Sequence, residues 1–402
     1  MDDPEGFLRS LFSAAIAAAS DFSMIPGLIP RTEGRIRVLA AGKAAASMAS
    51  AIEDAPPWWL KPGQMDGLVV TPPGHDLPLS TFQSLIAAHP VPDASSLAAG
   101  ERMLAMADAL AANDLLVALV SGGASALLAA PVSGLTLDDE IALNRSLLKV
   151  GVPIDQMNAA RVRLSRLKGG GLARAATPAR VVTVVVSDVP GDDPRRVGSG
   201  PTLAPPDVLL SPGILDLLPE GSRVVRDATP EGPVHVVVTA SQALGVARAM
   251  AEEAGLNVID LGASVEGEAR DVGRDHARMA FELPGDHRPA LVLSGGETTV
   301  TVRGSGRGGR NTEFLAAAME CAGGGSGLWG IAADTDGIDG SGPAAGAILR
   351  PDSFERARRL GLDLARTLQN NDALTLFEAL GDQIVTGPTR TNVNDFRALL
   401  IL

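Results

Sequence analysis

The chain has 402 residues and a formal net charge of −13, from 34 Lys and Arg against 47 Asp and Glu. This length exceeds the roughly 250–300 residues at which a single hydrophobic core usually stops growing, so we expect two domains. The acidic balance and the few aromatic residues, 9 Phe, 3 Trp and no Tyr, argue against a nucleic-acid-binding protein, which needs a basic surface and stacking side chains.

A single cysteine, Cys321, excludes an intramolecular disulfide and any zinc site built from several cysteines. The first residues are acidic where a secretory signal is basic, so Phe7–Ala19 predicts an ordinary amphipathic helix. No apolar run reaches the roughly 18–20 residues that cross a bilayer. We therefore expect a cytoplasmic protein that does not bind membranes.

Short apolar segments alternate with alanine-rich helical segments, which is typical of parallel α/β layers. The predicted strands are Ile36–Ala41, Gly67–Thr71, Leu115–Val120, Val181–Ser187, Val234–Thr239, Val258–Leu261, Ala290–Leu293, Thr299–Val302 and Gly330–Ala333. The predicted helices after the first are Ala44–Glu53, Ala94–Ala111, Leu137–Lys149, Gln242–Ala254, Gly267–Glu282, Asn311–Ala322 and Phe354–Leu360.

This alternation predicts an α/β fold in which a Rossmann-like, doubly wound parallel sheet is followed by a second, smaller α/β domain with a mixed sheet. The mixed sheet is expected because Leu291–Leu293 and Thr299–Val302 are too close for a helical crossover and so predict an antiparallel pair. Seven prolines lie between Pro201 and Pro233 and mark the boundary. We therefore expect domains at 1–232 and 233–402.

Five glycine-rich loops could bind an oxyanion through backbone N–H groups. They cover residues 41–44, 121–125, 168–171, 294–297 and 304–310, and three of them carry Lys or Arg. One such loop is more often a tight turn than a ligand site, because glycine supplies turns everywhere. Five in one chain indicate an anionic ligand with several phosphate-like groups.

The last of these loops, GSGRGG at 304–309, matches the dinucleotide-binding pattern Gly-x-Gly-x-x-Gly, after a predicted strand and before a predicted helix. Arg303, Arg307 and Arg310 surround it, and guanidinium groups suit transferring or terminal phosphates. The P-loop pattern Gly-x-x-x-x-Gly-Lys-Ser/Thr does not occur.

Only four lysines occur, which makes Lys43 and Lys168 notable because both lie in glycine loops. The ammonium group of Lys43, between a strand and a helix, could reach a phosphate oxygen, or it could be a solvated residue at a helix start. The same two interpretations, ligand contact or structural residue, stay open for Lys168.

Carboxylates follow two predicted strands, at Asp188 and in the segment 334–339. Such groups can orient Mg²⁺ or accept a proton from an attacking hydroxyl. A strand-end turn is the competing interpretation for Asp188, and a calcium loop or Asx turn for the second segment. The five histidines lack metal-ligand spacing and are expected to be structural or surface groups; they are His75, His89, His235, His276 and His287.

Seven long motifs in order resemble the glycerate 2-kinase family, in which a glycerate kinase domain precedes the MOFRL domain. They are AAGKAA (40–45), SGGASALL (121–128), LSRLKGGGLA (164–173), SDVPGDDPRRVGSGPT (187–202), LSGGETTVTVRGSGRGGRNTEFLA (293–316), ADTDGIDGSGPAAGA (333–347) and TGPTRTNVNDFRALLI (386–401). The resemblance implies ATP- and Mg²⁺-dependent phosphorylation of D-glycerate at its 2-hydroxyl, giving 2-phosphoglycerate, in a cleft between two α/β domains.

The resemblance implies catalytic roles for Lys43, Asp188, Arg310 and Asp336. We assign Asp188 to deprotonating or orienting the hydroxyl and Asp336 to substrate or Mg²⁺, and the reverse assignment stays open. The candidate nucleotide- and phosphate-binding residues are Gly42, Ser121, Gly122, Gly123, Ser125, Lys168, Ser294, Gly295, Gly296, Glu297, Gly306, Gly308 and Asn311. The expected partners are small molecules only, and the expected assembly is a monomer or a homodimer.

Two other functions stay open. A hydroxypyruvate reductase using NAD(P)H, a label that some relatives carry, would use the Gly-x-Gly-x-x-Gly loop but needs a proton donor beside the carbonyl. A catalytically inactive binding protein would be expected to have lost residues such as Lys43, Arg310 or Asp336, and all three are present.

Overall fold

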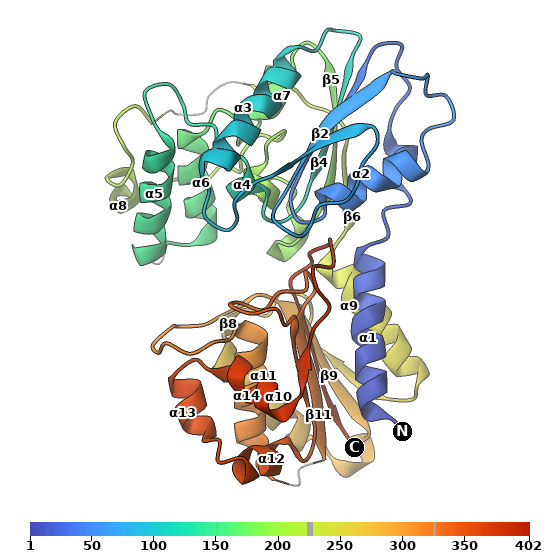
Figure 1. Ribbon diagram of the computed structural model, residues 1–402, viewed down its shortest axis with the longest axis vertical. Coiled ribbons are helices and arrows are strands. Elements are labelled where there is room, and N and C mark those ends of the chain that lie inside the picture. Colours follow the sequence, from blue (N-terminus) through green and yellow to red (C-terminus); the bar gives the residue numbers. More distant parts are fainter. Residues whose placement is uncertain (151, 223–227, 325–326) are drawn as a thin grey trace. The chain divides into compact units, whose positions relative to one another are not determined.

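The computed structural model describes residues 1–402 except 151, 223–227 and 325–326. The chain forms two compact units, Asp21–Val237 and Met1–Ser20 with Val238–Leu402. Each is an α/β structure, as expected (Figure 1), and we call them the parallel-sheet unit and the mixed-sheet unit. Among the described residues, no helix combines the length and apolar character needed to span a membrane.

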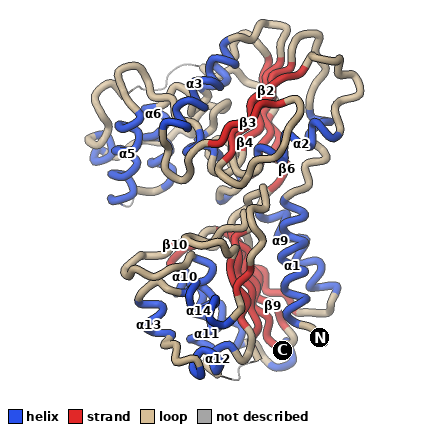
Figure 2. The backbone as a smooth tube through the Cα atoms, viewed as in Figure 1, coloured by secondary structure: helices blue, strands red, loops and turns tan. Residues whose placement is uncertain are grey.

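The parallel-sheet unit is built on six strands in the order β3-β2-β1-β4-β5-β6. Their bounds are β1 Ile36–Ala41, β2 Met65–Thr71, β3 Phe82–Ile86, β4 Leu115–Val120, β5 Arg180–Val186 and β6 Val234–Val238. Strands β1 to β5 pair in parallel, and β1 lies between β2 and β4. Every residue of β1 and β4 is buried, because helices cover both faces of the sheet; Figure 2 shows α2 and α3 on opposite sides of it.

The helices of this unit form two groups. Their bounds are α2 Ala45–Asp54, α3 Ala94–Asp108, α4 Ala124–Leu127, α5 Leu137–Val150, α6 Ile154–Leu164, α7 Gly171–Ala175 and α8 Pro212–Leu215. Helices α3, α4 and α7 share a core with the sheet through residues such as Leu39, Leu68 and Leu116. Helices α5, α6 and α8 pack around a smaller apolar cluster that includes Leu143 and Met157.

The mixed-sheet unit has six strands in the order β13-β12-β11-β14-β9-β7 and a separate two-stranded pair. Their bounds are β7 Asn257–Asp260, β8 Gly267–Glu268, β9 Ala290–Gly296, β10 Thr298–Thr299, β11 Leu328–Asp334, β12 Gly346–Leu349, β13 Gln383–Ile384 and β14 Asp395–Ile401. Strand β14 is antiparallel to both β11 and β9, whereas β7 is parallel to β9. The expected mixed sheet is therefore confirmed.

The antiparallel pair that we expected within this sheet is wrong. Strand β9 takes β14 and β7 as its neighbours, and the short β10 pairs in parallel with β8. Residues 300–302, which we expected to continue the strand, are irregular. Sequence proximity favoured the hairpin, but the most apolar partner for β9 lies about a hundred residues later, in the buried β14.

Helices cover both faces of the mixed sheet (Figure 1). Their bounds are α1 Pro4–Ala19, α9 Ala240–Glu253, α10 Ala269–Glu282, α11 Arg310–Ala322, α12 Ser353–Arg359, α13 Leu364–Gln369 and α14 Ala373–Leu380. The N-terminal helix α1 buries Leu8, Leu11 and Phe12, which recur at helical spacing, and the Phe12 ring lies 5.6 Å from that of Phe396 on β14.

Helices α10 and α11 approach each other at a glycine. A Cβ on Gly273 of α10 would lie 2.2 Å from the carbonyl oxygen of Phe314 on α11. By contrast, a Cβ on Gly245 of α9 would meet nothing within 4 Å. The same substitution should therefore have opposite effects at these two helical positions.

We expect Gly273→Ala to destabilise the protein by about 1–3 kcal/mol, because the added methyl group forces the two backbones apart. Gly245→Ala is the matched control and should stabilise it by about 1 kcal/mol, the usual gain in helix propensity. Urea unfolding of both variants measures the difference. Equal midpoints for the two variants would contradict the close helix contact.

Candidate functional site

Two loops lie side by side at the carboxyl edge of the parallel sheet, where open α/β sheets bind ligands. They follow the adjacent strands β1 and β4. The buried Ser121 Oγ accepts a hydrogen bond from the Ala44 N–H at 3.0 Å, and the Lys43 N–H donates to the Gly122 carbonyl at 2.9 Å. Gly42 has a φ of +126°, and a Cβ there would lie 2.1 Å from Ser121 Oγ, so the close contact requires glycine.

This contact places Lys43 beside the Ser-Gly-Gly loop. A Cβ on Gly123 would lie 3.6 Å from Lys43 Cγ and 3.2 Å from the ring of His89. The carbonyl of Lys43 lies 3.0 Å from Nδ1 of His75. Asp188 is half-buried and follows β5, the strand on the other side of β4. The sheet order therefore brings the predicted Lys43, Ser121 and Asp188 to three neighbouring strand ends.

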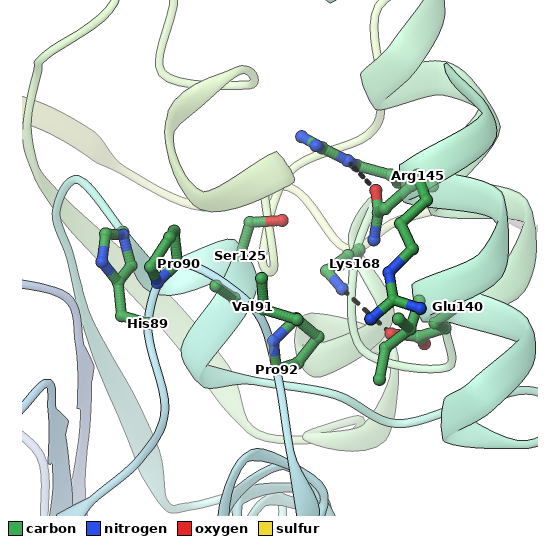
Figure 3. Close-up of a pocket in the computed structure, with 13 residues that line it drawn as sticks. His89, Pro90, Val91, Pro92, Ser125, Glu140, Arg145 and Lys168 are labelled. Carbon is green, nitrogen blue, oxygen red and sulfur yellow. Dashed lines mark hydrogen bonds and ion pairs between the residues drawn. The ribbon is translucent and has the colours of Figure 1, made fainter. Parts of the chain in front are cut away.

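A cavity of about 250 Å³ lies next to the Ser-Gly-Gly loop (Figure 3). Its walls come from the segment after β3, the loop after β4, helices α5 and α6, and the glycine loop at 168. The lining residues are His89, Pro90, Val91, Pro92, Gly123, Ser125, Ala126, Glu140, Ile141, Asn144, Arg145, Arg161 and Lys168. Two of our predicted phosphate-binding side chains, Ser125 and Lys168, are among them.

The cavity contains a buried ion pair between Lys168 and Glu140. The two side chains are each 5% exposed, and Lys168 Nζ lies 3.6 Å from Glu140 Oε2. Burial lowers the pKa of Lys168 and nearby Arg161 lowers it further, against the attraction of Glu140. The glycines after Lys168 hold this geometry, because the N–H groups of Gly169 and Gly170 donate to the carbonyls of Ser199 and Gly200.

In the glycine loop at 303–309 of the mixed-sheet unit, the backbone N–H groups donate hydrogen bonds to acceptors of the protein itself. Its N–H groups from Arg303 to Arg307 all donate to Asn370, Asn371 or Asp372. The N–H groups of Gly308 and Gly309 donate to side-chain hydroxyls. The predicted phosphate-binding Gly306 thus holds the loop against the segment before α14, and Gly308 holds it against Ser341.

The amino end of α11 is capped by a carboxylate from the chain itself. Asp339 accepts hydrogen bonds from the N–H groups of Asn311 and Thr312, each at 2.9 Å. Burial raises the pKa of Asp339, although these hydrogen bonds oppose the shift. The helix end that would receive a dinucleotide pyrophosphate is therefore already occupied by the Asp339 carboxyl group.

Arg310, the first residue of α11, is held by three carboxylates. Its guanidinium donates to Asp395 at 2.6 Å and to Asp334 and Glu297 at 2.7 Å each. Burial lowers its pKa, but the attraction of these carboxylates outweighs burial and raises the pKa of Arg310 above its ordinary value. Asp395 also pairs with Arg397, which is fully buried under the ring of Phe314.

The remaining predicted residues of this unit are largely buried. Asp336 accepts from the Ile338 N–H at 2.8 Å, so the Asx turn that competed with a ligand role is present. Ser294 is fully buried at the end of β9, and its Oγ lies 3.0 Å from Nε2 of His276. Burial and the charge of Arg397 lower the pKa of His276 to about 4, so this ring is neutral at pH 7.

Sequence reasoning missed five charged or polar residues of the cavity: His89, Glu140, Asn144, Arg145 and Arg161. Glu140 follows two other acidic residues in the first turn of α5, and nothing in that run marks it as the buried one. Arg161 is one of 30 arginines, whereas only the four lysines are rare enough to stand out in the sequence. His89 lacks metal spacing and was expected to be structural or at the surface.

Within the part of the chain that the structure describes, no three His, Cys, Asp or Glu residues are grouped to hold a metal ion. Asp334 and Asp395 are paired with arginine, and Asp339 with backbone N–H groups. Mg²⁺ can nevertheless bind through one or two carboxylates together with nucleotide phosphates. Asp188 and Asp336 are compatible with that mode.

The comparisons with known proteins cover both units. A model of the family described as Domain of unknown function (DUF4147) matches residues 7–211, and a model of the MOFRL family matches residues 290–395. A protein named putative hydroxypyruvate reductase from Agrobacterium vitis is 46% identical, over 98% of this chain and 94% of its own. A D-glycerate 2-kinase from Thermotoga maritima is 34% identical over 100% of both chains.

A solved structure is similar over the whole length. The crystal structure of a glycerate kinase from Thermotoga maritima has a TM-score of 0.84 to this chain at 31% identity, and the alignment covers 100% of both chains. The similarity therefore extends through both the parallel-sheet and the mixed-sheet units.

The Ser121 hydroxyl provides a test of how the Lys43 loop is held. Ser121→Ala leaves the buried Ala44 N–H without an acceptor, which should cost about 1–3 kcal/mol of unfolding free energy. We expect faster hydrogen exchange at residues 43–45. Ser146→Ala, at a half-buried position of α5 where the hydroxyl donates to the Ala142 carbonyl, is the control and should leave that exchange unchanged. Wild-type exchange in Ser121→Ala would show that this hydroxyl does not order the loop.

Proposed function

Since this chain belongs to the glycerate 2-kinase family, with a DUF4147 region followed by a MOFRL region, we propose that it transfers the γ-phosphoryl group of ATP to the 2-hydroxyl of D-glycerate. The observation that carries this proposal is the full-length similarity, in sequence and in structure, to glycerate kinases of Thermotoga maritima. The positively charged cavity beside Lys43 supports it, because both substrates are anions.

The residues at the sheet edge can do what phosphoryl transfer requires. This reaction needs little covalent chemistry from a protein, but it needs positioned cations and an oriented hydroxyl. In our proposal the Lys43 ammonium binds the transferring phosphoryl group and stabilises its charge. The Asp188 carboxylate, two strands away across β4, orients the 2-hydroxyl and accepts its proton. The Ser-Gly-Gly loop lies between them.

We carry over the family's roles for Arg310 and Asp336. Glu297 is the most exposed of the three Arg310 partners, with a side chain 54% exposed, so a phosphate would compete most easily for the nitrogen that Glu297 holds. Asp336 is the carboxylate proposed to hold the glycerate or the Mg²⁺ brought by the nucleotide. The metal supplies charge neutralisation between phosphate oxygens.

A hydroxypyruvate reductase is not favoured, although relatives bear that name. Its cofactor would need backbone donors in the loop 304–309, and these donors are bound to Asn370–Asp372 and to hydroxyl groups. Asp339 fills the adjacent helix end. No equivalent dinucleotide loop follows the strands of the parallel-sheet unit in the sequence.

The purified protein should release ADP from ATP only when D-glycerate and Mg²⁺ are present, and phosphorus NMR should identify 2-phosphoglycerate as the product. A parallel assay offers hydroxypyruvate with NADH or NADPH and should show no oxidation. Oxidation of the nicotinamide without any ADP release would refute the kinase proposal.

Lys43→Ala should lower kcat on the order of 10²-fold or more, because it removes a cation that acts on the transferring charge. The matched control, Lys149→Ala, removes an exposed lysine of α5 outside the cavity and should retain wild-type kcat. Circular dichroism verifies that both variants are folded. Wild-type turnover in folded Lys43→Ala would reject the role of this lysine.

The two aspartates should separate in their response to metal. Asp188→Asn is expected to lower kcat with little change in the Mg²⁺ requirement, because a proton acceptor acts in the transition state. Asp336→Asn should raise the Mg²⁺ or glycerate concentration needed for half-maximal rate. Titration of Mg²⁺ and glycerate against each variant measures this, and rescue of Asp188→Asn by excess Mg²⁺ would mean that the roles are exchanged.

A further inference from the structure

The charges around the cavity of the parallel-sheet unit do not balance. Lys168 is buried and pairs with Glu140, and the partly buried Arg161 lies close enough to lower the pKa of Lys168 by its charge. Arg161 donates to Asn144 at 2.6 Å and more weakly to Asn158, and no ion pair to it occurs in the described residues. Burial lowers the pKa of Arg161, which is the mark of a cation without a compensating anion. Among the described residues, the Arg161 guanidinium therefore has no anionic partner.

One carboxylate oxygen in the cavity also lacks a hydrogen-bond donor among the described residues. Glu140 is 4% exposed, and its Oε1 has no hydrogen-bond partner in the described residues, while Oε2 faces Lys168 at 3.6 Å. A buried carboxylate oxygen without a donor costs free energy. A ligand that suits the cavity must thus bring an anionic group for the arginines and a hydroxyl or N–H for Glu140.

The cavity adjoins the proposed reaction site and is small. Gly123 lines it, and the position of a Cβ on Gly123 is 3.6 Å from Lys43 Cγ. Its volume of about 250 Å³ is below the roughly 300–1,000 Å³ of pockets for drug-sized ligands, which favours a small acid over a nucleotide. Arg145, an exposed residue that also lines the cavity, adds a second guanidinium for a carboxylate.

We propose that this cavity is the acceptor pocket and that Glu140 is its specificity determinant. Arg145 and Arg161 bind the carboxylate of the hydroxy-acid, and Glu140 Oε1 accepts a hydrogen bond from the hydroxyl that is not phosphorylated. This inference rests on the proposed function for the identity of the acid. It explains why the pocket would select a dihydroxy-acid over an acid of similar size with one hydroxyl.

The pair D-glycerate and D-lactate tests this proposal, because lactate lacks only the 3-hydroxyl. Calorimetric titration of the whole protein should give a dissociation constant for D-lactate on the order of tenfold to hundredfold higher than for D-glycerate, the usual effect of one hydrogen bond to a charged group. Glu140→Gln should weaken glycerate binding toward that of lactate and leave the lactate constant nearly unchanged.

Three further measurements make the test sharp. Asp138→Asn, an exposed acid two residues earlier on α5, is the matched control and should retain the wild-type ratio. Arg145→Ala should weaken both acids alike, because it removes a carboxylate contact. If Glu140→Gln does not fold because Lys168 is left buried without its partner, the double variant Glu140→Gln/Lys168→Met removes the charge as well and should still lose the discrimination.

The outcomes separate the two proposals. Discrimination that depends on Glu140 supports this inference even if the protein releases no ADP, in which case only the kinase proposal fails. If Glu140→Gln keeps the wild-type ratio of the D-lactate and D-glycerate dissociation constants, the inference is overturned and the kinase assay is unaffected. This result is expected if one water in the adjoining cavity of about 10 Å³ donates a hydrogen bond to Glu140. If Glu140→Gln raises the KM for ATP but not for glycerate, the inference is likewise overturned, because the cavity would then be a nucleotide pocket.

Discussion

A buried N–H group needs an acceptor, and this constraint distinguishes the glycine loops of the chain from one another. In the loop 303–309 the protein supplies every acceptor, and the loop is a fixed connection against the segment before α14. The loops after β1 and β4 instead form a few hydrogen bonds with each other, centred on Ser121, and these hold Lys43 at the sheet edge. Loops with similar glycine patterns therefore have different roles: one is a fixed connection, and the others position Lys43.

The two units also differ in how their buried charged groups are paired. In the mixed-sheet unit, Asp395 lies between Arg310 and Arg397, and each of these three charges has a partner of opposite sign. Burial raises the pKa of Asp395, but the two arginines outweigh burial and lower it. Around the cavity of the parallel-sheet unit, Lys168 pairs with Glu140, whereas Arg161 donates to Asn144 and Asn158 and has no ion pair among the described residues. A complete network stabilises a fold, whereas an incomplete one next to a cavity is suited to a ligand.

The sequence predicted most of the regular structure, because the buried parallel strands β1, β4 and β5 are continuous apolar runs that periodicity detects. It missed β14, whose Asp395 and Arg397 interrupt an apolar run although both are buried as an ion pair. It also missed β3, an edge strand with exposed Gln83 and Ser84. For the site, glycine loops located Lys43 and Lys168, but Glu140 and Arg161 become significant only through the packing of α5 on α6.

The partition of the chain has a consequence for synthesis on the ribosome. Helix α1 is made before the parallel-sheet unit, yet the strand that carries its partner Phe396 is made after it, and Glu5 of α1 pairs with Arg350. The unit Asp21–Val237 is continuous in sequence and has its own core, so it can fold while the rest of the chain is still being made. The part of the apolar stripe of α1 that packs on β14 then stays uncovered until that strand has been made, which is the interval when a chaperone would engage this nascent chain.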